Sequence, residues 1–161
     1  MIKQIHSFEY FLLAINELNE TEKQLYEAAL SAIAQAYAPY SNFRVGCSIL
    51  LSSGNIVCGA NQEVASYPVC LCAEGVALST ASSKHSEETI VAMFVAVKGK
   101  DGWVYDVAPC GVCRQRILEY EKRYRQNIAL YWPVSEKTIL KVSSIKHLLP
   151  FAFSGDKLES P

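Results

Sequence analysis

Two short cysteine motifs constrain this chain more than any other feature: Cys72–Glu74 (CAE) and Pro109–Cys113 (PCGVC). Cys110 and Cys113 are three residues apart, so both can face one metal ion from a single helical turn. With Cys72 they would supply three thiolates, one fewer than the four ligands that close a structural zinc site. The open fourth position would hold a water molecule that the metal activates. The fold must therefore bring two segments that are distant in sequence together.

Length and charge narrow the class of protein. The chain has 161 residues, half of them apolar, and a formal net charge of −1. We expect one domain over residues 1–161, able to bury a core without disulfides. The charge provides no overall attraction for nucleic acid or anionic membrane, and no apolar run has membrane-spanning length. The start lacks the features of a signal peptide, so we expect a cytoplasmic protein whose six cysteines are free thiols and metal ligands.

Hydrophobic periodicity predicts the order of the elements. Residues 2–13 fit either a strand or a short helix, and Asn19 or Thr21 could cap the first long helix. A helix followed by a β-hairpin and then alternating helices and strands predicts a three-layer α/β/α domain with a mixed five-stranded sheet. The expected elements are helices at 20–37 (ended by Pro39), 70–83, 110–124 and 144–149, strands at 43–51, 55–60, 90–97, 128–132 and 137–142 (an edge strand), and a loop at 98–108.

Both cysteine motifs are then expected at helix N-termini. Free N–H groups and partial positive charge at that end favour thiolates, the form that binds zinc. Glu74 lies two residues after Cys72 and would carry protons to and from the activated water. Its alternative role is a solvated glutamate of the first helical turn, stabilised by the helix dipole.

Cys70 leaves a different class of protein open. Cys70 and Cys72 could join Cys110 and Cys113 in a closed four-thiolate site, which would make the chain a non-catalytic, zinc-stapled binding module. The C-x-C spacing argues against this, because alternate residues point apart in an extended segment. Residues Cys47 and Cys58 lie in apolar strands and are most simply small buried hydrophobes.

Four ordered segments resemble one known family. They are Tyr37–Gly46, Asn61–Pro68, Pro109–Gln115 and Leu148–Phe153. These segments are similar to signatures of the small, homotetrameric cytidine deaminases, and the resemblance covers roughly residues 22–158. It implies zinc-dependent hydrolysis of cytidine and deoxycytidine to uridine and deoxyuridine, with release of ammonia, as in pyrimidine salvage. Zn²⁺ would be held by Cys72, Cys110 and Cys113, with Glu74 as the proton shuttle.

The resemblance also implies substrate contacts. Asn61 and Glu63 would bind the sugar 3′-hydroxyl, although loop capping is the simpler role for such residues taken singly. Phe43 would face the pyrimidine, although a first core residue of a strand fits the same position. Ala73 would also contact the substrate. Positions that complete a neighbouring subunit's pocket in the family are occupied here by Ala65, Tyr67 and Phe153, which implies a homotetramer with shared active sites.

Two departures from the family pattern stand out. Gly75 replaces the arginine that usually follows the glutamate and is thought to offset the negative charge of three thiolates. We hypothesise that another cation, with Arg114 as a candidate, replaces it, or that the zinc is more electron-rich and turnover slower. Val64 replaces the asparagine usual between Glu63 and Ala65 and removes a hydrogen-bonding side chain close to the sugar-binding strand, which leaves the substrate preference open.

Other substrates remain open at this stage, namely a modified nucleoside, an aminopyrimidine antibiotic or polynucleotide cytosine. Five basic residues between positions 114 and 126 could contact nucleic acid, but a solvated helix face or a subunit contact explains them better because the whole chain is not basic. Asn61 and Glu63 favour a free ribose.

Overall fold

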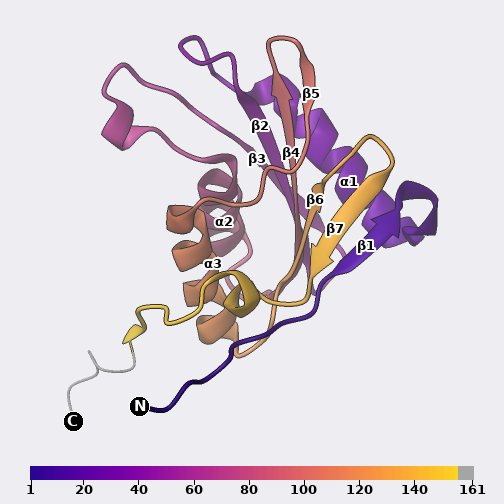
Figure 1. Ribbon diagram of the computed structural model, residues 1–161. Helices are drawn as coiled ribbons and strands as arrows, with labels where there is room; N and C mark the ends of the chain where they lie inside the picture. The colour runs from indigo at the N-terminus through magenta and orange to yellow at the C-terminus, as the bar shows by residue number, and fades with distance from the viewer. Residues whose placement is uncertain (156–161) are drawn as a thin grey trace.

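The computed structural model describes residues 1–155 and shows helices packed on both faces of one twisted sheet (Figure 1). Residues 156–161 lie outside the described residues. They include the end of the expected domain and the last positions of the family resemblance. The helices are α1 (Glu20–Ala32), α2 (Ala73–Lys84) and α3 (Gly111–Tyr124). The strands are β1 (Phe11–Ala14), β2 (Arg44–Leu51), β3 (Ile56–Ala60), β4 (Ile90–Gly99), β5 (Gly102–Val104), β6 (Ala129–Pro133) and β7 (Thr138–Val142). Short 3₁₀ turns cover Ile15–Glu17, Ile33–Gln35, Tyr67–Val69 and Ile145–Leu148.

The three-layer α/β/α prediction is confirmed, but the sheet is larger than expected. Within residues 1–155 it has seven strands in the order β1-β7-β6-β4-β2-β3, with β5 paired to β4. Its parallel pair is β4 with β6, so the sheet is mixed. The expected loop at 98–108 contains β5, because Gly102 has a φ of 128° and turns the chain back along β4. The expected edge strand β7 is internal, since β1 pairs with it along its free side.

Strand β4 lies at the centre of the sheet and is buried on both faces, as its apolar run predicted. Ala92 and Phe94 pack in the cluster that includes the inward side of α1. Met93 and Val95 point to the opposite face and pack in the cluster shared with α2 and α3. Alternation along one strand therefore attaches both helical layers to the same sheet.

Two glycines on neighbouring strands let the helices approach the sheet closely. A methyl group on Gly46 of β2 would overlap the carbonyl oxygen of Ala29 in α1. A methyl group on Gly59 of β3 would lie 2.6 Å from the carbonyl oxygen of Ala73 and 2.5 Å from the backbone nitrogen of Ala77, both in α2. These contacts bring the start of α2 down onto the sheet, where the first cysteine motif lies.

The helix boundaries differ from the expected ones in ways that matter for the site. Asn19 caps α1, and its side chain accepts a hydrogen bond from the backbone of Glu22. The α-helix ends at Ala32 and tightens to a 3₁₀ turn, so it stops before Pro39. α2 begins at Ala73 instead of Cys70, because the Tyr67–Val69 turn and the extended backbone of Cys72 precede it.

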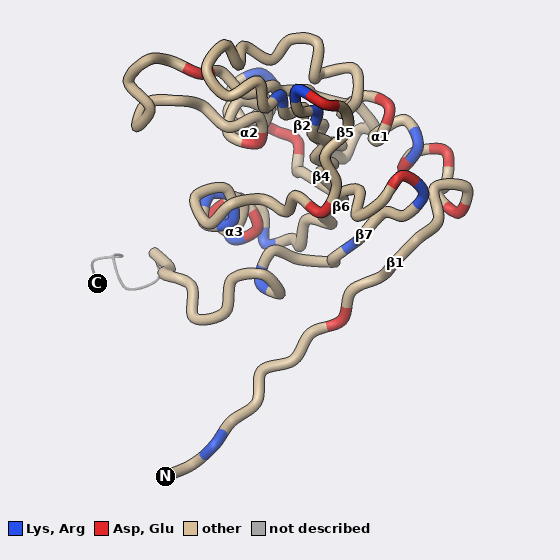
Figure 2. Tube along the Cα trace, turned by 45° about the horizontal axis from the view of Figure 1, so that its top comes forward, with Lys and Arg blue, Asp and Glu red and all other residues tan. Residues whose placement is uncertain are grey.

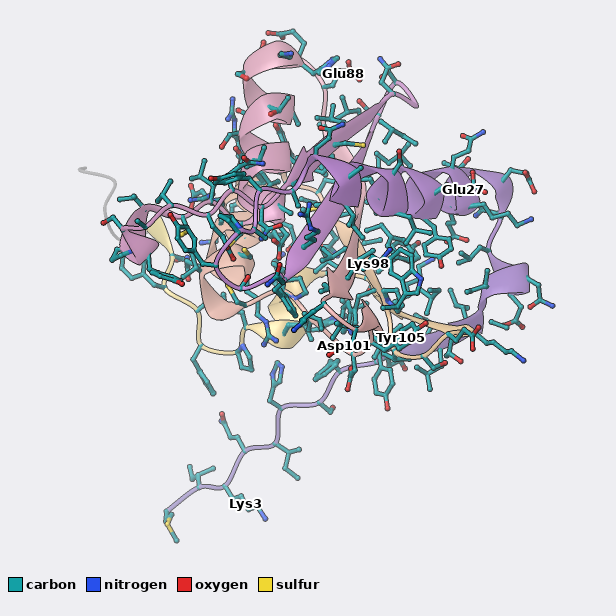
Figure 3. All side chains as sticks on the ribbon, turned by 90° about the horizontal axis from the view of Figure 1, so that it is seen from above. Lys3, Glu27, Glu88, Lys98, Asp101 and Tyr105 are labelled. Atoms are coloured by element: carbon teal, nitrogen blue, oxygen red, sulfur yellow. The ribbon has the colours of Figure 1, made fainter. Side chains whose placement is uncertain are left out.

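Charges are spread along the trace, with basic and acidic residues interspersed (Figure 2). The first ten residues form no helix or strand and run away from the domain, carrying Lys3 far from the sheet (Figure 3). Phe8 of this segment stacks on His147, with ring centroids 5.7 Å apart. Among the described residues, no helix is long and apolar enough to cross a membrane.

Candidate zinc centre and active site

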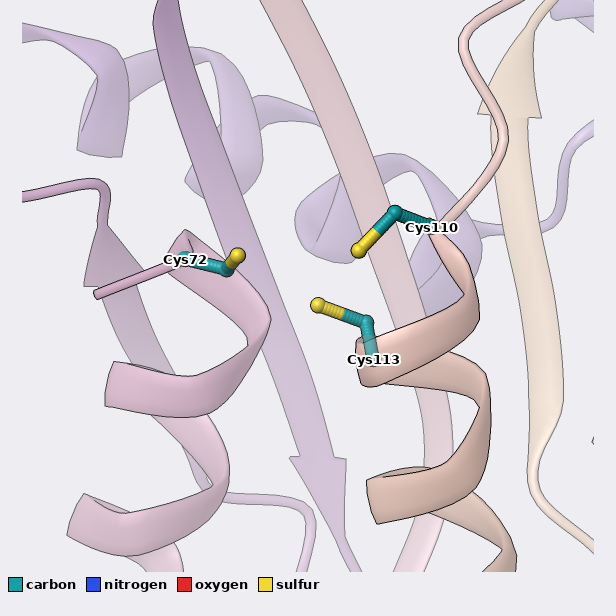
Figure 4. A group of neighbouring side chains, drawn as sticks. All are labelled: Cys72, Cys110 and Cys113. Atoms are coloured by element: carbon teal, nitrogen blue, oxygen red, sulfur yellow. The ribbon is translucent and has the colours of Figure 1, made fainter. Parts of the chain in front are cut away.

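The two cysteine motifs meet where the first turns of α2 and α3 lie side by side (Figure 4). The sulfur atoms of Cys72, Cys110 and Cys113 all lie within 4.8 Å of one another. Cys72 is the N-cap residue of α2, Cys110 is the N-cap residue of α3, and Cys113 follows in the first turn of α3. The donor set fits Zn²⁺, since three soft thiolates converging on one point leave a fourth position open.

The sulfurs interact with one another before any metal is considered. A hydrogen bond from Cys113 is the main reason that the pKa of Cys72 falls to about 7, although nearby Glu74 and burial oppose the shift. The same hydrogen bond, together with burial, raises the pKa of Cys113. Cys72 is therefore the thiolate that forms most readily, and bound Zn²⁺ would draw all three sulfurs into that form.

Cys70 does not join the cluster. Its sulfur lies against the backbone of Val64, 3.3 Å from the nitrogen and 3.5 Å from the oxygen. The closed four-cysteine site considered from the sequence is therefore not formed, and the geometry favours the open three-thiolate site. Cys47 is buried as expected, whereas Cys58 is half-buried.

Glu74 is buried beside the sulfurs, with 5% of its surface exposed. Burial raises the pKa of its carboxyl, while a hydrogen bond with Cys113 and the charge of Arg116 partly oppose the shift. The solvated first-turn role is thus wrong for this residue. A carboxyl whose protonated and charged forms are closer in energy is suited to exchanging protons near neutral pH.

A cavity of about 290 Å³ opens in front of Glu74, and its lining is mostly apolar. Small-molecule sites commonly combine an apolar wall with a few placed polar groups. Seven of the fourteen residues around it are among those expected from the sequence, namely Phe43, Asn61, Glu63, Tyr67, Cys72, Glu74 and Cys110.

Asn61 and Glu63 line this cavity and also hold its loops. The Asn61 side chain accepts from Val45 N at 2.8 Å and donates to Phe43 O at 2.9 Å. Glu63 accepts from the backbone nitrogen of Tyr40 at 3.0 Å and from the backbone and hydroxyl of Ser41. The hydroxyl of Ser41 is the main reason that the pKa of Glu63 is lowered.

The loop-capping role considered from the sequence is therefore present. Each side chain retains hydrogen-bonding capacity toward the cavity, because an amide offers four sites and a carboxylate about four.

The remaining expected contacts differ in their surroundings. Phe43 lines the cavity and is 37% exposed, so it is not a core residue. Ala73 is fully buried in the core and can offer only its backbone to a substrate. Ala65, Tyr67 and Phe153 are exposed, and Phe153 lies outside the cavity lining of this single chain.

Arg114 is not free to act as the expected cation. Its Nε donates to the carbonyl of Pro109 at 2.7 Å, and its Nη1 donates to that of Leu148 at 2.9 Å. Arg123, two turns further along α3, donates to the hydroxyl of Ser82 in α2. Arg114 and Arg123 therefore each link separate parts of the fold.

Comparison with known proteins gives the family. Residues 19–126 match the family model for the cytidine and deoxycytidylate deaminase zinc-binding region. The chain belongs to this deaminase family. A cytidine deaminase from Halalkalibacterium halodurans is 34% identical over 84% of this chain and 96% of its own length. The crystal structure of cytidine deaminase from Burkholderia pseudomallei superposes with a TM-score of 0.69 and 35% identity, covering 81% of this chain and 98% of that one. A blasticidin-S deaminase from Bacillus cereus is 29% identical over 64% of this chain and 75% of its own.

Sequence reasoning missed much of the wall of the deaminase cavity. Val95, Val107 and Ala108 contribute from β4 and from the segment before α3. Val95 belongs to a run that the sequence assigned to the core, and Val107 and Ala108 lie in the expected loop. No local signal separates such residues from ordinary core or loop positions, because their role depends on where the cysteine helices lie.

Proposed function

We propose that this protein is a zinc-dependent hydrolase that deaminates cytidine and deoxycytidine. One observation carries the proposal: three cysteine sulfurs converge beside one small cavity, which Cys72, Cys110 and the buried Glu74 line. The zinc ligands would be Cys72, Cys110 and Cys113, and Glu74 would be the catalytic residue. Membership of the deaminase family supports the same chemistry.

The proposed reaction depends on proton transfers by Glu74. Bound Zn²⁺ would lower the pKa of a water molecule so that it attacks carbon C4 of the pyrimidine near neutral pH. Glu74 would accept the proton of that water and deliver it to ring nitrogen N3 as the C4–O bond forms. It would then take the remaining proton of the C4 hydroxyl and pass it to the amino nitrogen, and the C4–N bond would break as the C4=O bond forms, releasing ammonia. One water is consumed, and Glu74 returns to its starting charge.

The substrate would be oriented by residues on the far side of the cavity. Phe43 would lie against the pyrimidine, and the backbone of Ala73 would contact the base. Asn61 and Glu63 would use their remaining hydrogen-bonding capacity for the sugar 3′-hydroxyl, which cytidine and deoxycytidine share. Their fixed positions, held by bonds to Val45 and Ser41, would reduce the entropic cost of binding.

We also propose a cytoplasmic homotetramer acting in pyrimidine salvage. Tyr67, which lines the cavity, is 61% exposed, and Phe153 is 66% exposed. Exposed large apolar side chains that lie together commonly mark interaction surfaces. In the proposed assembly, Ala65, Tyr67 and Phe153 would complete the cavity of a neighbouring subunit.

Ultraviolet-monitored deamination by the purified, zinc-quantified protein tests this function. Cytidine, deoxycytidine and blasticidin S would be compared, with Glu74→Gln as the matched control. We expect turnover of both nucleosides, reduced about 10²–10⁴-fold in the variant while zinc is retained. Turnover of blasticidin S alone would reassign the substrate, and zinc without any turnover would contradict the proposed function. Light scattering of the same sample would test for four copies.

A further inference from the structure

A three-thiolate zinc site has an excess of negative charge. Zn²⁺ held by three thiolates leaves a net charge of −1, and the buried carboxyl of Glu74 lies beside it. Cys113 and Glu74 are buried whereas Cys72 and Cys110 are exposed, so the excess charge is only partly screened by water and is stabilised by a nearby cation or aligned N–H groups. The helix N-termini at Cys72 and Cys110 supply N–H groups but no full positive charge.

Arg116 brings a full positive charge to this position. It lies in α3, one turn after Cys113, and its side chain crosses to the start of α2. A methyl group on Gly75 would overlap Nη1 of Arg116 and would lie 3.3 Å from its Cζ. The guanidinium therefore rests against Gly75, which directly follows Glu74 and is three residues after Cys72 in the first turn of α2.

We propose that Arg116 is a positioning residue that balances the charge of the zinc–thiolate centre, and that Gly75 is the space its guanidinium needs. The inference rests on the proposed zinc site. The two positions form a pair in different helices: the small residue in α2 is required because the cation comes from α3. Any side chain at position 75 would occupy the place that Nη1 of Arg116 holds, so the guanidinium would have to move.

Zinc affinity, measured by competition with a chromogenic chelator, tests the pair without any substrate. We expect Arg116→Ala to weaken zinc binding about 10–100-fold, as loss of a residue supporting metal ligands commonly does. Arg116→Lys keeps the charge and should retain much of the affinity. Arg123→Ala is the matched control, because Arg123 also joins α3 to α2 but contacts Ser82, away from the cysteines.

Gly75→Ala changes the position of the Arg116 guanidinium without removing its charge. In the parent protein its methyl group should displace the guanidinium and weaken zinc binding several-fold, even though alanine favours the helix. In the Arg116→Ala background the same change should cost nothing, because there is no guanidinium to displace. The double variant Gly75→Arg with Arg116→Ala places the charge on the other helix and should recover affinity relative to Arg116→Ala alone.

Two results would overturn the proposal. One is zinc affinity in Arg116→Ala equal to that in Arg123→Ala. The other is an equal loss from Gly75→Ala with and without Arg116, since the position of the guanidinium would then not matter. If the zinc affinities follow the expected pattern but no pyrimidine is deaminated, the substrate assignment fails and the role of Arg116 stands.

Discussion

Glu121 is the buried carboxylate that joins the helix carrying two of the cysteines to the rest of the domain. Only 2% of its surface is exposed. Its Oε1 accepts from the backbone nitrogens of Ile128 at 2.9 Å and Ile145 at 3.0 Å, and its Oε2 accepts from the hydroxyl of Ser144 at 2.8 Å. One side chain of α3 thereby satisfies the segment before β6 and the turn after β7.

The cost of removing this carboxylate follows from its partners. Glu121→Ala leaves two buried backbone N–H groups without an acceptor, each costing about 1–3 kcal/mol. We therefore expect the free energy of unfolding to fall by about 2–6 kcal/mol. For a domain of this size that corresponds to a melting temperature lower by at least about 4 °C. The first turn of α3, with Cys110 and Cys113, should lose zinc at lower denaturant concentration.

Glu121→Gln is the matched control. Its amide oxygen can still accept from both backbone nitrogens, and its amide nitrogen can donate to Ser144, so the loss should be only about 1 kcal/mol. Urea unfolding of the zinc-loaded proteins, followed by circular dichroism at one fixed zinc concentration, measures the difference. Equal stability of the Ala and Gln variants would refute the argument that the unpaired N–H groups set the cost.

Three further predictions concern the metal, the cavity and pH. Cys72→Ala should lose zinc and activity whereas Cys70→Ala should keep both, and metal analysis after dialysis checks this. Asn61→Ala should raise KM and also lower the melting temperature by a few degrees, because the side chain both lines the cavity and holds its loops; a change in KM alone would contradict the second role. Although burial opposes it, hydrogen bonds, the largest from Tyr131 at 2.7 Å, lower the pKa of Glu22. Its stabilisation is therefore present above the usual pKa of 4.5 and is lost as the pH falls through the lowered value, so Glu22→Gln should unfold with a weaker acid dependence.

Local patterns in the chain were sufficient for most of the secondary structure. Apolar periodicity predicted the three helices and the β2–β3 hairpin, and the continuous apolar run predicted the buried central strand. β5 was missed, and β1 lies where residues 2–13 had been left open as a strand or a short helix; both elements depend on pairing. β1 and β5 are short and have no strong pattern of their own, and each forms by extending a strand that is already in place.

The candidate site likewise has features that the sequence predicted and features that only the tertiary structure shows. Spacing alone identified the zinc-binding motifs and the glutamate beside them, because the three groups must follow the geometry of one helical turn and one metal ion. The sequence suggested Arg114 as the compensating cation and did not single out Arg116, although both lie on one helix near the cysteines. Only the packing of α3 against α2 directs Arg114 to two carbonyls and Arg116 to Gly75.

The amino-acid sequence by itself therefore determined which groups the proposed chemistry depends on: three cysteines, a glutamate beside them and an α/β framework to present them. Tertiary structure decided which polar groups serve that chemistry and which serve the fold. Cys70, a possible zinc ligand in the linear chain, contacts the backbone of Val64 instead, and Glu121 binds the ends of two distant segments. The physical reason is that burial and hydrogen-bond partners depend on contacts between remote segments, which local spacing does not encode.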